Sequence, residues 1–151
     1  MIKINFNIDE PFWVREMPLF KKSIFKAAKE TLNTACKVKE YNLEVSFLLT
    51  SDSSIRLLNK NYRNKDKSTN VLAFPMNQNL FGENYIVGDI AISLQKILDE
   101  SKNLKIQKYE YLSKITIHGV LHLLGFDHKS DKQYEEMNKI EQKVYQKIFS
   151  R

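Results

Sequence analysis

The segment His118–His128, HGVLHLLGFDH, constrains the fold of this chain more than any other stretch. It contains all three histidines of the 151-residue sequence and two of its four glycines. Each residue of an α-helix advances about 100°, so His118 and His122 project from one face, one turn apart. Gly125 permits the positive φ with which many helices end, and the reversed chain then brings His128 toward the other two imidazoles. The spacing predicts a helix, a tight reversal and a cluster of three imidazoles.

The rest of the chain mixes strand and helix patterns. Period-two alternation and short apolar runs predict four strands, at residues 2–8, 43–50, 70–74 and 85–93. Apolar residues at helical spacing predict helices at about 19–37, 52–62, 94–103, 107–124 and 131–149. We place a turn at residues 9–11, a polar basic loop after residue 62, the end of the third strand at Pro75 and a turn-rich excursion at residues 78–84. We therefore expect an α+β fold, a mixed four-stranded sheet packed with about five helices, in one domain over residues 1–151.

Composition and charge narrow the class of protein. A chain with 42% hydrophobic and 28% charged residues is typical of an ordered globular protein. Its 24 Lys and Arg exceed its 18 Asp and Glu, and the net charge of +6 favours a polyanionic partner. The sequence shows neither a secretory signal pattern nor a stretch of membrane-spanning length, and we expect Cys36 to be a buried structural thiol. We therefore expect a cytoplasmic protein without a membrane partner.

The three histidines predict a metal centre. Three imidazoles with a fourth position left to water are typical of catalytic zinc, whereas structural zinc sites are closed and usually rich in thiolates. The alternative is that two histidines bond backbone carbonyls in the core and the third caps the helix. In zinc peptidases with an HExxH helix, a glutamate follows the first histidine, and here that position is Gly119. A metal that lowers the pKa of its water to about 7 supplies hydroxide without that glutamate, which suits a phosphodiester substrate.

Three ordered motifs carry a resemblance to a known family. HGVLHLLGFDH resembles the signature of the YbeY family, the bacterial metal-dependent endoribonucleases of ribosomal RNA maturation. LNKNYRNKDKSTNVLAFP is similar to that family's segment from LN and YR to a T-[DN]-VLSFP strand, and VGDIAIS is similar to its GDI-x-IS strand. Met137 and Glu141 fall where the family's closing helix tends to place Met and Glu. Ser68 replaces a frequent proline and Ala73 replaces the serine of VLSFP, but neither change affects the histidines.

The resemblance implies a zinc-hydrolase-like site on an α+β fold. Its metal ligands would be His118, His122 and His128, and its catalytically important arginine would be Arg63. A guanidinium in a basic loop can bind a phosphate bidentately and neutralise charge at phosphorus, although a loop arginine taken alone is more often only solvated. The all-imidazole set favours Zn²⁺, and the affinity order of divalent metals also allows Ni²⁺ or Cu²⁺.

The same resemblance implies a function. It is that of a single-strand-specific endoribonuclease in 16S rRNA 3′ end maturation and ribosome quality control. Its partners would be ribosomal RNA and the small ribosomal subunit, with ribosomal proteins and a ribosome-assembly GTPase as further partners. A second hypothesis is a ribosome-assembly factor that binds RNA and whose metal is structural. A third is a zinc peptidase, against which Gly119 counts.

Four further residues have open roles at this stage. Asp127 either accepts a hydrogen bond from a ligand imidazole or serves as a turn residue. Asp89, inside an apolar strand, either pairs with a buried partner or faces the cleft. Gly88 either admits a ligand close to the backbone or marks a bulge. We expect Met137 to fill the core rather than to line the metal centre.

Overall fold

The four strands form one mixed sheet in the order β1-β2-β4-β3. The computed structural model describes residues 1–37 and 40–150 of the chain. The strands are β1 (Ile2–Ile8), β2 (Asn42–Thr50), β3 (Val71–Phe81) and β4 (Asn84–Ser93). β2 pairs in parallel with both β1 and β4, whereas β3 pairs antiparallel with β4 and forms an edge of the sheet. The predicted mixed four-stranded sheet is confirmed.

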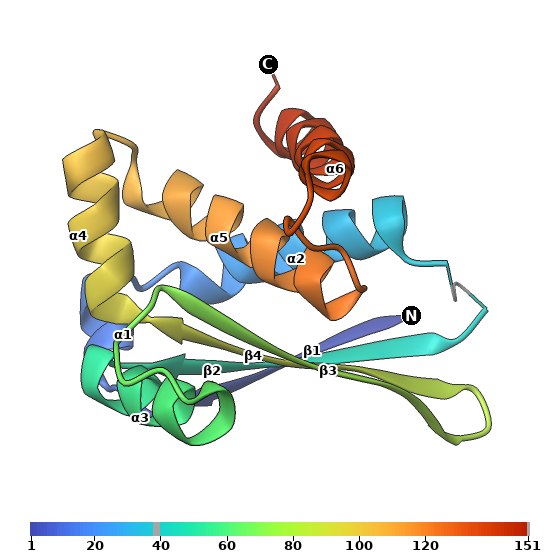
Figure 1. The fold of residues 1–151 in the computed structure, drawn as a ribbon, viewed down its shortest axis with the longest axis horizontal. Helices are drawn as coiled ribbons and strands as arrows, with labels where there is room; N and C mark the ends of the chain where they lie inside the picture. The colour runs from blue at the N-terminus through green and yellow to red at the C-terminus, as the bar shows by residue number, and fades with distance from the viewer. Residues whose placement is uncertain (38–39, 151) are drawn as a thin grey trace.

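The helices cover the two faces of the sheet unequally. They are α1 (Phe12–Glu16), α2 (Phe20–Ala35), α3 (Asp52–Arg63), α4 (Leu94–Leu104), α5 (Lys108–Leu123) and α6 (Asp131–Phe149). Helices α2 and α5 lie side by side on one face, α6 packs across them on the outside, and α3 lies on the opposite side of the sheet (Figure 1). Within the part of the chain that is described, no helix has both the length and the apolar character needed to cross a membrane.

The main core lies between the sheet and the layer of α2 and α5. On β2 the alternating residues Leu43, Val45, Phe47 and Leu49 are at most 4% exposed and face these helices. Helix α5 is buried around most of its circumference, and the second half of its sequence is apolar on nearly every side. Because the core fixes α5 against the sheet, it also fixes the two histidines that α5 carries.

Gly119 sets how closely α5 approaches the sheet. A Cβ at this position would lie 3.2 Å from Cγ2 of Val71 and 3.3 Å from Cγ2 of Ile90. This face of α5 therefore packs directly on β3 and β4, and any side chain at this position would require Val71 and Ile90 to shift by a few tenths of an ångström. The glycine at the position of the peptidase glutamate thus also permits close packing of the helix on the sheet.

Two features of the fold differ from the sequence expectation. The short helix α1 was not predicted; it buries Trp13, whose Nε1 donates to the carbonyl oxygen of Thr50 at 3.0 Å. The third strand was expected to end at Pro75, but β3 continues to Phe81 and turns into β4 at Gly82, whose φ is +56°. An edge strand tolerates a proline because one side of its backbone needs no partner in the sheet.

Candidate metal centre

Helix α5 ends in a reversal that presents the third histidine. The N–H of Gly125 donates to the carbonyl oxygen of His122 at 3.1 Å, and that of Phe126 donates to Leu121 at 3.0 Å. These two nested hydrogen bonds form a Schellman motif, which requires the positive φ that Gly125 adopts at +94°. The predicted role of this glycine is confirmed, and the chain after it returns toward the helix.

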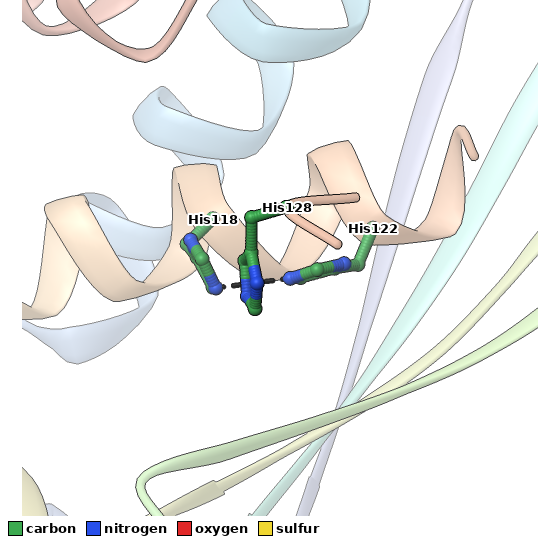
Figure 2. Close-up of side chains that lie close together, drawn as sticks. All are labelled: His118, His122 and His128. Atoms are coloured by element: carbon green, nitrogen blue, oxygen red, sulfur yellow. Dashed lines mark hydrogen bonds between the residues drawn. The ribbon is translucent and has the colours of Figure 1, made fainter. Parts of the chain in front are cut away.

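The three imidazoles meet at one point, as Figure 2 shows. One ring nitrogen from each of His118, His122 and His128 lies within 4.8 Å of the others. The Nε2 atoms of His118 and His122 are 3.0 Å apart. Nitrogen ligands of a tetrahedral zinc, each at about 2.0–2.1 Å, lie about 3.3 Å from one another. The three imidazoles could therefore hold a divalent metal ion once the rings move closer together.

A carboxylate from α6 fixes the orientation of the first imidazole. Oε1 of Glu141 lies 2.8 Å from Nδ1 of His118. An ionised carboxylate only accepts hydrogen bonds, so Nδ1 carries the proton and Nε2 keeps its lone pair for the cluster. This is the usual arrangement behind a metal-binding histidine. The sequence resemblance gave Glu141 no role. Met137, one helical turn earlier, is buried, so residues on this face of the helix point inward, and the i, i+4 spacing of the two residues is the sequence pattern that indicates it.

The surroundings of His122 favour the neutral form of its imidazole. Burial is the largest cause that lowers the pKa of His122, and the adjacent rings of His118 and His128 lower it further. The carboxylate of Asp127 and the backbone of Phe126 oppose this shift only in part. Metal ions bind the neutral imidazole, so the surroundings of His122 match the requirement for a ligand.

Arg63 lies in the same cleft as the three histidines. This hollow of about 590 Å³ runs between the end of α5 and β3, and Lys65 and Lys129 also line it. Arg63 is the last residue of α3, where Asn64 ends the helix at φ +58°. Its Nη2 donates to the carbonyl oxygen of Ala73 at 3.0 Å, so the guanidinium bridges from the helix end to the edge strand. The structure thus brings together all four residues that the sequence analysis singled out.

The basic loop after α3 is tied down by a buried asparagine. Asn59 is 2% exposed, and its Nδ2 donates to the carbonyl oxygen of Lys67 at 3.0 Å. The backbone carbonyl oxygen of Asn59 accepts from the N–H of Lys65 at 3.3 Å. Arg63 is held through a backbone atom of Ala73, so the serine that the resemblance expected there is not needed for this contact.

Two of the open roles are now decided. Oδ1 of Asp127 accepts the N–H of His128 at 2.8 Å, and its other oxygen lies 3.7 Å from Nζ of Lys129, so Asp127 is a turn residue. The carboxylate that contacts a ligand imidazole is Glu141 instead. Met137 is 2% exposed and packs in a core cluster with its apolar neighbours, as expected.

The two residues of the β4 motif also have defined places. Gly88 marks a bulge, because the β2–β4 register shifts between Glu44 and Val45, opposite it. A Cβ on Gly88 would lie 2.5 Å from the carbonyl oxygen of Phe74. Asp89 follows neither of its predicted alternatives: it is exposed and lines a different hollow together with Ser46.

The fold and the site define a class of protein, an α+β domain with an open centre of three histidines formed by one helix and a glycine reversal. The family model described as endoribonuclease YbeY matches residues 14–149. Proteins named endoribonuclease YbeY are 32% identical in Neorickettsia sennetsu, over 96% of both chains, and 39% identical in Aquifex aeolicus, over 71% of both. The chain belongs to the YbeY family.

A solved structure agrees at the level of the fold. The solution structure of TM1509 from Thermotoga maritima superposes with a TM-score of 0.59 at 24% identity, covering 99% of this chain and 89% of that one. The likeness extends over nearly all of the chain, so the sheet order and helix layers belong to a fold that has been observed experimentally.

Proposed function

We propose that this protein is a single-strand-specific, metal-dependent endoribonuclease of the cytoplasm that acts in 16S rRNA 3′ end maturation and ribosome quality control. The observation that carries the proposal is the meeting of three imidazoles and one guanidinium in a single cleft. The relatives named endoribonuclease YbeY support the reaction class. Ribosomal RNA in the small subunit is the expected substrate, with ribosomal proteins and an assembly GTPase as further partners.

The proposed metal is zinc, held by His118, His122 and His128, with Ni²⁺ as the alternative occupant. Zinc with three nitrogen ligands and an open position acts as a Lewis acid and lowers the pKa of a coordinated water to about 7. Glu141 keeps the proton of His118 on Nδ1, and this leaves Nε2 available as a ligand.

The basic groups of the cleft complement a phosphodiester. Within the part of the chain that is described, Arg63 donates one N–H to Ala73, and its other donors can bind two oxygens of one phosphate. Lys65 and Lys129 line the same hollow and add positive charge. These groups orient the substrate and neutralise the charge that develops on the phosphoryl oxygens as the bond to phosphorus breaks.

The direct test is cleavage of a single-stranded RNA by zinc-loaded protein and its variants. We expect His118→Ala to abolish cleavage and Arg63→Ala to lower kcat by about 10²–10³-fold, the usual loss when one charge-stabilising donor is removed. Arg56→Ala is the matched control, since Arg56 lies on the same helix and pairs with Asp66 at 2.8 Å. Equal cleavage by all four proteins would refute the assigned site.

Metal removal separates this function from that of an assembly factor with a structural metal. The main core is apolar and lies between the sheet and its helices, whereas His118 and His122 are half-buried and His128 is exposed. We therefore expect the chelated protein to keep its circular dichroism spectrum and to lose cleavage. If chelation unfolded the chain instead, the metal would be structural and the assembly factor would be favoured.

A further inference from the structure

A second hollow adjoins the histidine cleft. It measures about 450 Å³ and lies between the end of α2, the β3–β4 hairpin and α6. The two hollows share Gly125, Phe126 and Asp127 as lining residues. A Cβ on Gly125 would meet no atom within 4 Å, so the space beside this glycine, which lines both hollows, is open. A ligand bound at the histidines can therefore extend into the second hollow.

The lining of the second hollow suits a flat, uncharged group. Cys36, Tyr85, Leu124 and Phe126 supply apolar and aromatic surface. Tyr85 is itself braced by Tyr41, with ring centroids 5.7 Å apart. A few polar side chains stand around this surface, as in pockets that bind small molecules by shape and orient them by hydrogen bonds.

The net charge of the lining side chains differs in sign between the two hollows. The histidine cleft carries Arg63, Lys65 and Lys129, and the second hollow carries Glu136 and, among the described residues, one cation, Lys37. Asp127 lines both hollows, so the described charges are net positive in the first and net negative in the second. Phosphate groups are attracted by the first set of charges and repelled by the second. The part of a nucleotide that fits the second hollow is therefore its base.

On the side of the β3–β4 hairpin, the edge of the second hollow is held in place by contacts within the protein. The β3–β4 register shifts between Pro75 and Gln78, and Asn77 in this bulge adopts φ +49°. Its Nδ2 donates to the carbonyl oxygen of Leu123 at 3.0 Å, which ties the hairpin to the end of α5. Bulges beside functional sites re-aim side chains in this way.

We propose that the second hollow binds the nucleobase next to the phosphate held at the histidines, and that it prefers adenine, cytosine and guanine over uracil. The inference rests on the proposed endoribonuclease function. Each of the three preferred bases has an exocyclic amino group, and this group can donate a hydrogen bond to the carboxylate of Glu136, which lines the hollow. Uracil has no amino group and places carbonyl oxygens on both sides of its single ring N–H, so the same carboxylate disfavours it.

The experiment uses oligouridine strands that contain one test base, A, C, G or U, at the centre. Cleavage beside that base is measured for zinc-loaded wild type, Glu136→Gln and Glu135→Gln, with bis(p-nitrophenyl) phosphate as a substrate that has no base. Glu135 is the control because it is exposed on the same helix and does not line the hollow. We expect wild type and Glu135→Gln to prefer amino-bearing bases by about tenfold, as for a hydrogen bond to a charged group. Glu136→Gln should lose most of that preference and hydrolyse the base-free substrate at the wild-type rate.

The outcomes separate the two proposals. RNA cleavage with no base preference, or with a preference that is the same in Glu136→Gln and Glu135→Gln, would overturn the base pocket and leave the endoribonuclease intact. Failure of wild type to cleave either RNA or bis(p-nitrophenyl) phosphate would overturn the endoribonuclease, and the base pocket with it.

Discussion

Two side chains of the centre are held by hydrogen bonds that use only some of their polar atoms. Glu141 binds Nδ1 of His118 and thereby leaves Nε2 for the cluster. Among the described residues, Arg63 binds the carbonyl oxygen of Ala73 through Nη2, and no hydrogen bond engages its other donors. In both cases one hydrogen bond within the protein orients the side chain, and other atoms of the contacting groups are left to bind a metal ion or a phosphate. Such preorganisation reduces the entropy cost of ordering side chains when a ligand binds.

The contact of Glu141 makes a prediction about metal affinity. Glu141→Ala removes the acceptor that fixes the His118 tautomer and ring, and loss of such a partner weakens metal binding by about 10–100-fold. Competition with a chromophoric chelator measures this directly, without reference to activity. Glu135→Gln, on the same helix and exposed, serves as the control. Zinc affinity within twofold of wild type in Glu141→Ala would show that the carboxylate does not support the metal.

At the scale of single residues, the sequence could predict contacts between residues that are separated by one helical turn or one loop. His118, His122 and His128 follow from helical spacing and a glycine. The contact of Glu141 with His118 could not be derived, because it depends on how α6 crosses α5. The same holds for Asn77, whose contact with Leu123 needs both the bulge and the docking of the hairpin against α5.

Among the elements, glycines control how closely α5 packs on the sheet. Gly119 on the helix faces Val71 and Ile90, and Gly88 on β4 faces Leu123, whose Cδ2 would lie 2.8 Å from an added Cβ. The cleft between α5 and β3 therefore depends on the absence of side chains at these positions. This close packing belongs to the same helix that carries two of the three histidines.

Gly88→Ala should therefore be strongly destabilising. The added Cβ would lie 2.5 Å from the carbonyl oxygen of Phe74, and the residue has φ +154°. Backbone strain and overpacking together predict a loss of about 2–4 kcal/mol in the free energy of unfolding. Gly82→Ala separates the two causes, because Gly82 also has positive φ but no atom within 4 Å of an added Cβ; it should cost about 1–2 kcal/mol. Equal denaturant midpoints for the two variants would mean that the close contact at Gly88 costs nothing.

The elements that sequence patterns predicted are those with a regular buried face. β2 alternates over its length, and the apolar stripe of α6 recurs at helical spacing. α1 has five residues with one buried side chain, Trp13, and is too short for periodicity to indicate it. The continuation of β3 beyond Pro75 depends on its edge position, which is a property of the sheet and not of the local sequence.

Over the whole molecule, the position of positive charge matters more than its total. The chain carries a net charge of +6, yet its lysines lie on several different helices, strands and loops. Arg63, Lys65 and Lys129 line the histidine cleft, whereas Lys26 and Lys29 are exposed on α2 and do not line it. Only the first set lies where a phosphate chain would cross the proposed metal centre.

This difference predicts how RNA binding depends on salt. Each phosphate contact on a single strand contributes about −0.7 to the slope of log K against log salt concentration, so three cleft cations predict a slope of about −2. The double variant Lys65→Ala/Lys129→Ala should make the slope less steep by about 1.4, whereas Lys26→Ala/Lys29→Ala removes the same charge elsewhere and should leave it nearly unchanged. Fluorescence anisotropy of a labelled single-stranded RNA across a salt series measures both. If the two double variants changed the slope equally, RNA would respond to the total charge of the protein, and the cleft would not be its main binding surface.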